Sequence, residues 1–203
     1  MASDAVAAPP RPVRERVLDA ATEITCTTGW GDVTMAKVAT MAKVSRQTVY
    51  NEYGAKPALG QAMVLRELDR FLAVVSHELE NHDDLVEAIR AAARGALALA
   101  HENPLLHAVL ASAHSVSAGS GPGSDNDLLP FLTTDAAPLI EAAKAVVVER
   151  LDRFPELGLS AEELDASVDA IIRLVLSHVM QPGGDPERTG DDLAWIVRRV
   201  LRP

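Results

Sequence analysis

The sequence predicts an all-α protein, and two observations support that prediction. Apolar residues make up 48% of the 203 residues, whereas aromatic residues make up only 3%. The apolar share is dominated by Ala, Leu and Val rather than by the residues that favour strands. These apolar residues recur at steps of three and four along most of the chain, which is the spacing of one helix face. We therefore expect about nine helices.

The acidic charge is divided unevenly along the chain. The formal net charge is −10, yet residues 1–60 contain seven Lys or Arg and six Asp or Glu, a net of +1. The remaining residues contain twelve basic and twenty-three acidic side chains, a net of −11. A DNA duplex repels an acidic body, so a DNA-binding protein of this composition must approach the phosphates with its N-terminal end. The asymmetry permits DNA binding without proving it.

The sequence lacks the features that would indicate a secreted protein, a membrane protein, an enzyme or a metalloprotein. A single cysteine, Cys26, excludes an intramolecular disulfide, and neither a secretion signal nor an apolar stretch of roughly 20 residues is present. We expect a cytoplasmic protein with no membrane partner. The sequence has no Gly-rich phosphate loop and no nucleophile elbow, so we expect neither an enzyme nor a cofactor. His107 and His114 share a helix face but lack carboxylates at metal-ligand spacing, so no metal site is expected.

The N-terminal residues are predicted to contain a tail and one long helix. Residues 1–10 have no apolar period and are expected to be disordered. The first helix is expected from Pro12 to Thr28, and Gly29 follows as a stop signal.

Two capping residues begin the second and third helices, each only about two turns long. Thr34 precedes the second helix, and Ser45 can accept the backbone amide of Gln47 or Thr48 at the start of the third. Short helices joined by a tight turn have the dimensions of a helix-turn-helix motif. Residues 11–56 are therefore predicted to be a DNA-binding domain.

The larger part of the chain, residues 57–203, is predicted to form one helical domain. Pro57 suits the first turn of a long helix, and its apolar stripe continues through Leu79. A Gly- and Ser-rich segment over 119–127 is expected to be a loop. The other helices are expected from an Asp83 or Asp84 cap to Pro104, from Pro104 through Leu110, over 136–154, from a Ser160 cap to Met180, and over 191–201.

The exposed face of the third helix is rich in hydrogen-bonding side chains. Only Val49 is withdrawn for packing, whereas a helix that merely faced water would more often have Glu and Lys on this face. The polar residues of this face are Arg46, Gln47, Thr48, Tyr50 and Asn51.

The run from Val44 to Lys56, VSRQTVYNEYGAK, together with Gly29 and Thr34, resembles the signature of the TetR family of regulators. The resemblance covers about residues 11–60. It implies a TetR-like fold, with an N-terminal helix-turn-helix and a C-terminal domain for dimerisation and effector binding. Two positions depart from the family pattern: Lys43 occupies a turn position where Gly is usual, and Glu52 stands where His is frequent. A non-Gly residue at 43 is expected to have a modest cost if its backbone is left-handed.

By that resemblance, the third helix reads DNA. Arg prefers guanine O6 and N7 while Gln and Asn suit adenine, so Arg46, Gln47 and Asn51 are expected at base edges. Contacts to phosphates set register rather than sequence. The residues expected to cap helices, hold phosphates or both are Thr34, Ser45, Thr48, Tyr50 and Lys56.

The resemblance also implies a homodimer through the eighth and ninth predicted helices, over 160–180 and 191–201. Their apolar stripes need a cover, and ordinary core packing within one chain remains an alternative. Two-fold symmetry would match two half-sites on a palindromic operator. The residues expected at the interface are Val168, Ile171, Ile172, Val175, Val179, Leu193, Trp195, Ile196, Val197 and Val200.

An effector pocket is expected among the fourth to eighth helices, and its ligand is expected to be small and mostly apolar. Most of the candidate wall residues could equally be plain core. The candidates are Met63, Phe71, Leu97, His101, Asn103, Leu105, His107, Val109, Phe131 and Ile140. The function predicted is a ligand-responsive repressor bound to double-stranded DNA, and the alternative is a helical small-molecule-binding or adaptor module without DNA binding.

Overall fold

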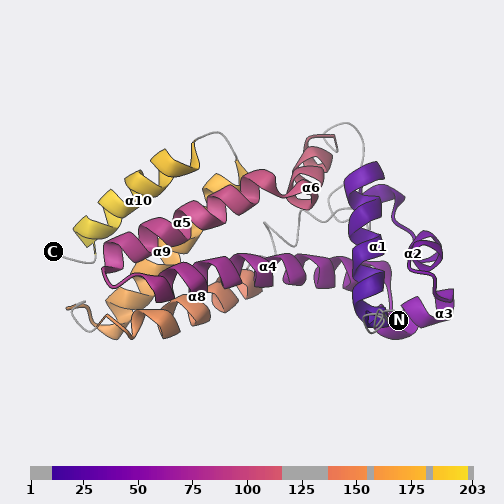
Figure 1. The fold of residues 1–203 in the computed structure, drawn as a ribbon, viewed down its shortest axis with the longest axis horizontal. Helices are drawn as coiled ribbons and strands as arrows, with labels where there is room; N and C mark the ends of the chain where they lie inside the picture. The colour runs from indigo at the N-terminus through magenta and orange to yellow at the C-terminus, as the bar shows by residue number, and fades with distance from the viewer. Residues whose placement is uncertain (1–10, 116–136, 155–157, 182–184, 201–203) are drawn as a thin grey trace, which may run out of the picture.

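The computed structural model describes residues 11–115, 137–154, 158–181 and 185–200, with side chains at 111–115 and 200 left out of the description. These residues form nine α-helices and one 3-10 turn, which confirms the predicted all-α fold (Figure 1). The predicted tail over 1–10 and loop over 119–127 lie outside the described residues.

Three helices form the N-terminal domain: α1 (Val13–Thr28) and the shorter α2 (Met35–Met41) and α3 (Arg46–Tyr53). The predicted caps are confirmed, because Thr34 Oγ1 accepts the amide of Lys37 at 3.2 Å and Ser45 Oγ accepts that of Thr48 at 3.0 Å. The 3-10 turn η1 (Trp30–Asp32) follows α1 and was not expected from the pattern. It places the buried Trp30 ring in the domain core.

Six helices form the body, and most begin where the sequence predicts. α10 is the exception, since it starts at Pro186, five residues before the predicted Asp191. Pro suits the first turn of a helix, and Asp185 Oδ1 accepts the amide of Glu187 at 3.2 Å, so the helix begins at this earlier site. The body helices are α4 (Lys56–Asn81), α5 (Leu85–Glu102), α6 (Pro104–Ser115), α8 (Ala137–Leu151), α9 (Ala161–Met180) and α10 (Pro186–Val200).

The long helix α4 connects the two parts of the molecule. In Figure 1 it runs along the long axis, from the N-terminal domain at one end into the body at the other. Helices α5 and α8 both pack against α4, α9 packs against α8 and α5, and α10 covers α5. The exposed helix α3 and the terminal helix α10 therefore lie at opposite ends of the molecule.

The N-terminal core extends beyond the first three helices. Its buried cluster includes Leu59 and Met63 from α4 and Leu105 and Val109 from α6. A second cluster lies within the body and includes Leu79, Leu85 and Leu151 among others. The first turns of α4 and the helix α6 thus pack with α1 as well as with the body, which links the two parts through apolar contacts.

Polar contacts also fix the N-terminal domain. Arg66 of α4 donates to Asp19 and to the Thr22 hydroxyl on α1, both at 2.7 Å. Arg16 of α1 donates to the carbonyls of Ala42 and Lys43 in the turn before α3, the latter at 3.2 Å. Lys43 has a φ of +55°, so the backbone at this position is left-handed and the condition for a modest cost at a non-Gly residue is met.

Candidate functional site

One face of α3 is exposed and polar. Ser45, Arg46, Gln47 and Asn51 are exposed, Tyr50 is 41% exposed, and Thr48 is half-buried. Val49 and Tyr53 point inward and are buried, so they attach the helix to the domain core. The structure therefore brings together, on one surface, all the α3 residues that the sequence singles out for DNA binding.

Two amides on this face are joined to each other. Gln47 Nε2 donates to Asn51 Oδ1 at 2.9 Å, one helical turn apart. This bond holds both side chains in one orientation, and within the described residues it leaves the second N–H of Gln47 and the NH₂ group of Asn51 for an external partner. The Arg46 guanidinium has no hydrogen-bond or ion-pair partner within the described residues. Amide and guanidinium donors at the start of an exposed helix are the groups that read adenine and guanine edges.

The arginines of α1 are engaged within the protein. Arg11 pairs with Asp19 at 2.7 Å, Arg16 holds the turn before α3, and Arg14 lies 4.7 Å from the centre of the Tyr53 ring. Arg14 also lies 3.9 Å from the carboxylate of Glu52, which directs that negative charge toward α1. Burial raises the pKa of the Tyr53 hydroxyl, which donates to the carbonyl of Arg14 at 2.9 Å. Through Arg14 and Arg16, α1 therefore holds α3 and the turn before it in place.

Thr34 and Lys56 border the same end of the molecule. Thr34 is exposed at the start of α2. Lys56 begins α4, donates to the carbonyl of Gly31 at 3.4 Å and lies 4.9 Å from the centre of the Trp30 ring. An ammonium beside the first amides of a helix is suited to a phosphate, because both present positive charge.

The body contains an elongated apolar cavity of about 200 Å³. Its wall is formed by α4, α5, α6, α8 and α9, and it reaches from Met63 to Leu79 along α4. At 1.5 Å per residue those two positions are about 24 Å apart along the helix. The lining residues are therefore spread along a large part of α4.

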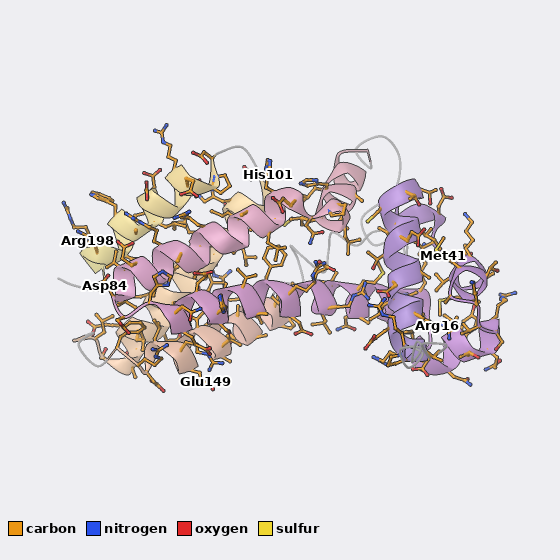
Figure 2. The ribbon with its side chains drawn as sticks, viewed as in Figure 1. Arg16, Met41, Asp84, His101, Glu149 and Arg198 are labelled. Carbon is orange, nitrogen blue, oxygen red and sulfur yellow. The ribbon has the colours of Figure 1, made fainter. Side chains whose placement is uncertain are left out.

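The structure brings about half of the predicted wall residues to this cavity. Met63, Phe71, Asn103, Leu105 and Val109 line it. Leu97 and Ile140 are instead buried core residues, and His101 and His107 are exposed, with their rings edge-on at 6.5 Å. Figure 2 labels His101 at the end of α5, on the outer side of the body. Phe131 lies outside the described residues.

Sequence reasoning missed the acidic residue in the wall, Glu67. Among the described residues, Glu67 and Asn103 are the two polar side chains that line the cavity, and they bond to each other, with Asn103 Nδ2 donating to Glu67 Oε2 at 2.8 Å. The signal was present, because Glu67 stands one turn from Met63 and one turn from Phe71 on the apolar stripe of α4. A carboxylate at such a position indicates a polar function or a polar partner inside the body.

Glu67 acts electrostatically on the neighbouring core as well. Burial first, and then the negative charge of Glu67, raise the pKa of the Cys26 thiol on α1. Cys26 therefore stays protonated and unreactive at neutral pH. Within the described residues, no group of three or more His, Cys, Asp or Glu is placed to hold a metal ion. No helix in the described part of the chain is long and apolar enough to cross a bilayer.

The predicted interface residues differ in how far they are buried within their own chain. Val168, Val179, Leu193 and Val197 are buried within their own chain, and Ile171, Ile172, Val175 and Ile196 are half-buried. Trp195 differs from all of these, since it is 60% exposed on α10 and has Arg199 stacked 4.9 Å from its ring centre. The side chain of Val200 lies outside the described residues. The exposed apolar area on α10 is therefore centred on Trp195.

The chain is similar to known transcriptional regulators over most of its length. Residues 84–199 match the family model described as the C-terminal domain of the bacterial tetracyclin repressor. The HTH-type transcriptional regulator AlkX of Mycobacterium tuberculosis (strain ATCC 25618 / H37Rv) is 33% identical over 191 residues, which cover 93% of this chain and 83% of the relative.

Solved structures show the same architecture. The TetR family repressor AlkX from Dietzia sp. strain DQ12-45-1b, implicated in biodegradation of n-alkanes, superposes with a TM-score of 0.72 at 26% identity and covers 96% of this chain and 98% of its own. GusR of Salmonella enterica has a TM-score of 0.61 at 18% identity, with 97% of this chain and 98% of its own covered. Because GusR is only 18% identical to this chain, its similarity shows the fold alone.

Proposed function

The chain belongs to the TetR family of transcriptional regulators, and from this premise we propose that it is a cytoplasmic repressor that binds a palindromic operator as a homodimer and releases it when an apolar effector fills the cavity. The observation that supports DNA reading most directly is the exposed polar face of α3, whose Arg46 has no partner within the described residues. In this proposal Arg46, Gln47 and Asn51 contact base edges.

The remaining N-terminal polar groups position the protein on the duplex. Thr48, Tyr50 and Lys56 contact phosphates, and the capping residues Thr34 and Ser45 add their hydroxyls. The basic N-terminal end approaches the DNA while the acidic body stays away from it, in keeping with the net charges of +1 and −11 for the two parts.

We propose that the dimer forms through the outward faces of α9 and α10, with Trp195 as the central contact. A tryptophan that is 60% exposed presents a large apolar area, and residues of this type are the ones that most often dominate interface energy. The predicted residues that are buried in their own chain, such as Val168 and Val197, would support the interface helices from behind. A two-fold dimer presents two copies of α3 to successive major grooves.

The effector is proposed to be an elongated aliphatic molecule. The lining of the cavity extends over about 24 Å of α4, and among the described residues it is apolar apart from Glu67 and Asn103, which suits an extended chain better than a compact ring system. The Dietzia repressor, implicated in biodegradation of n-alkanes, shares 26% of its residues with this chain over nearly the whole length. That likeness supports an aliphatic effector here.

Release of DNA is proposed to follow from the shared walls of the cavity. Met63, Leu105 and Val109 line the cavity and also belong to the core of the N-terminal domain. A ligand that fits better when α4 and α6 are displaced would move these residues, and the two α3 helices would then no longer match the half-sites. Only a difference in ligand affinity between the two states can produce this shift.

The experiment begins with selection of bound DNA from a random pool, which is expected to return a palindrome. Operator-bound protein is then titrated with n-alkyl compounds of increasing length, and release of the operator is measured by fluorescence anisotropy.

The variant Ala96→Leu, whose larger side chain would fill part of the cavity, is expected to keep operator affinity but lose the response to ligand. Ala98→Leu is the matched control, because Ala98 is exposed on the same helix. Release that is equal in both variants would disprove the cavity as the effector site.

The alternative is a helical ligand-binding module without DNA binding. The double variant Arg46→Ala with Tyr50→Ala separates the two readings in a gel-shift assay. Loss of the shifted band is expected if α3 reads DNA, whereas an unchanged band would favour another surface. The regulators among its relatives and the exposed polar face of α3 weigh against this alternative.

A further inference from the structure

We propose that the cavity selects a neutral unbranched aliphatic ligand with one hydroxyl group, and that this hydroxyl bonds to the Glu67–Asn103 pair. The inference rests on the proposed function, because it names the ligand class of the same cavity. It goes further by assigning the polar specificity to two side chains that lie among apolar residues.

The Glu67–Asn103 pair is held in place by both of its helices. Asn103 is only 5% exposed, and its Oδ1 accepts the amide of Leu106 at 3.0 Å, which caps the start of α6. Its Nδ2 donates to Glu67 Oε2 at 2.8 Å. Arg70, one turn further along α4, donates to Oε1 and Oε2 of Glu67 at 3.3 Å and 3.2 Å. The pair is therefore a fixed polar element in the cavity wall.

Counting hydrogen bonds shows which group would complete this pair. An ionised carboxylate has about four acceptor positions, and the bonds from Arg70 and Asn103 to Glu67 use two on Oε2 and one on Oε1. One acceptor position on Oε1 and the second N–H of Asn103 are left among the described contacts. A ligand hydroxyl can donate to the first and accept from the second, because it is both a donor and an acceptor.

The charge of the wall disfavours an anionic ligand. No Lys, Arg or His lines the cavity among the described residues, and Arg70 is 61% exposed in its side chain, outside the lining. The negative charge of Glu67 acts on groups inside the protein, since it contributes to the raised pKa of the Cys26 thiol. A fatty carboxylate would bring a second negative charge next to Glu67 in an environment of low dielectric constant.

An aliphatic chain without a donor would be disfavoured for a different reason. An alkyl ether can accept from Asn103 but cannot donate to Glu67, so its presence would remove water from that carboxylate without replacing the hydrogen bond. Hydrogen bonds to charged groups are the stronger ones. We expect the hydroxyl compound to bind roughly tenfold or more tightly than an ether of equal chain length.

The position of the pair also sets the orientation of the ligand. Glu67 lies one turn after Met63, near the end of the cavity that borders the N-terminal domain, and three turns before Leu79. The hydroxyl would therefore lie toward α6, and the alkyl chain would extend into the body between α5, α8 and α9.

The experiment uses the full-length protein and three probes with similar chain length: 1-decanol, 1-methoxynonane and decanoate at pH 7.5. Dissociation constants are measured by isothermal titration calorimetry for the wild type, for Glu67→Gln and for Glu102→Gln. Glu102 is exposed and does not line the cavity, so its variant is the matched control for loss of one negative charge. Thermal melting establishes that each variant is folded.

The wild type and Glu102→Gln are expected to bind 1-decanol about tenfold or more tightly than either other probe. Glu67→Gln is expected to reduce that preference to less than about threefold and to bind decanoate more tightly than the wild type does. Decanoate binding to the wild type as tightly as 1-decanol would overturn the inference, as would an unchanged ranking in Glu67→Gln. Should that variant fail to fold, the ranking in the wild type decides.

Operator release is measured separately, so that the two proposals can fail independently. If the probes bind in the expected order but none releases the operator, the ligand inference stands and the proposed induction is wrong. If release occurs with decanoate and not with 1-decanol, the induction stands and the ligand inference is wrong. If none of the three probes binds, the proposed aliphatic effector is wrong and the inference falls with it.

Discussion

The N-terminal domain and the helical body use the same kinds of side chain in opposite ways. In α1 to α3 the apolar residues fill a core, and the polar residues of α3 stand exposed with Arg46 available to a partner. In α4 to α9 the apolar residues surround a cavity of about 200 Å³, and polar residues are nearly absent from its wall. One part presents polar groups outward, and the other encloses an apolar space, which we propose receives the effector.

This difference indicates where the molecule can change shape. A filled core resists deformation, because close-packed side chains have few alternative arrangements. The walls of a cavity can move when a ligand replaces empty space. Leu105 and Val109 belong to both regions, so a change in the cavity reaches α1 through α6. Arg66 adds a polar link to Asp19 and Thr22 on the same helix.

The largest expected effect concerns the outward face. Arg46→Ala is expected to weaken operator binding by about 2–6 kcal/mol per dimer, because one base contact of about 1–3 kcal/mol is lost at each half-site. That is roughly a thirtyfold to twenty-thousandfold loss of affinity. Fluorescence anisotropy with operator and with a scrambled duplex measures it. The scrambled duplex should show a much smaller change, and equal losses on both duplexes would mean that Arg46 contacts phosphates rather than bases.

The next effect tests whether the body also pairs through its outer surface. Trp195→Ala is expected to weaken the dimer by about 2–4 kcal/mol, since truncation of a central aromatic contact has costs of this size. The change is measured as the dimer dissociation constant by analytical ultracentrifugation.

Met41→Ala is the matched control for this test. Met41 is another exposed apolar side chain, 42% exposed, and Figure 2 shows it at the opposite end of the molecule from Arg198 of α10. It should leave the dimer unchanged. A dimer that is weakened by Met41→Ala and not by Trp195→Ala would move the interface to the N-terminal domain.

A third prediction tests how closely α4 and α5 pack against each other in the body. A Cβ added to Gly95 on α5 would lie 2.7 Å from Val74 Cγ1 on α4, so these helices are in close contact beside the cavity. Gly95→Val is therefore expected to lower the free energy of unfolding by about 1–3 kcal/mol. Urea denaturation measures it, and Gly31→Ala serves as the control, because a Cβ at Gly31 meets nothing within 4 Å. A neutral Gly95→Val would mean that α4 and α5 separate easily.

Local chemistry made much of the fold predictable from the sequence. The caps at Thr34 and Ser45 were identified because hydroxyl side chains bond to nearby amides, and Ser160 forms a full capping box with Glu163. Asp84 likewise accepts the amides of Val86 and Glu87. Such contacts involve residues two or three apart, so they can be read without knowledge of the tertiary structure.

The cavity was less predictable, because periodicity identifies inward-facing residues without separating core from cavity wall. Leu97 and Phe71 have the same apolar character, yet only Phe71 lines the space. Glu67 was missed since a carboxylate interrupts the apolar stripe, and its role depends on Asn103, which is 36 residues away. The earlier start of α10 depended on the Asp185 cap, a signal that was present and overlooked.

The smallest expected effect is at the turn that orients the outward face. Lys43 has a φ of +55°, a backbone conformation that is costly for a residue with a Cβ, whereas glycine adopts it readily. Lys43→Gly is expected to raise the free energy of unfolding by up to about 1 kcal/mol, since the relief of strain is partly offset by the entropy of glycine in the unfolded chain. Thermal melting should detect a rise of about 2–4 °C.

Lys43→Gly also removes a positive charge beside α3, so operator affinity is expected to fall slightly, and more at low salt than at high salt. Lys43→Asn separates the two effects, because Asn tolerates the left-handed conformation better than Lys and likewise lacks the charge. If strain is the cause, both variants melt higher than the wild type, with glycine highest. If Lys43→Gly instead melts at a lower temperature than the wild type, the Lys43 side chain itself stabilises the turn in which Arg16 contacts the backbone carbonyls. The N-terminal domain would then be less rigid than its filled core indicates.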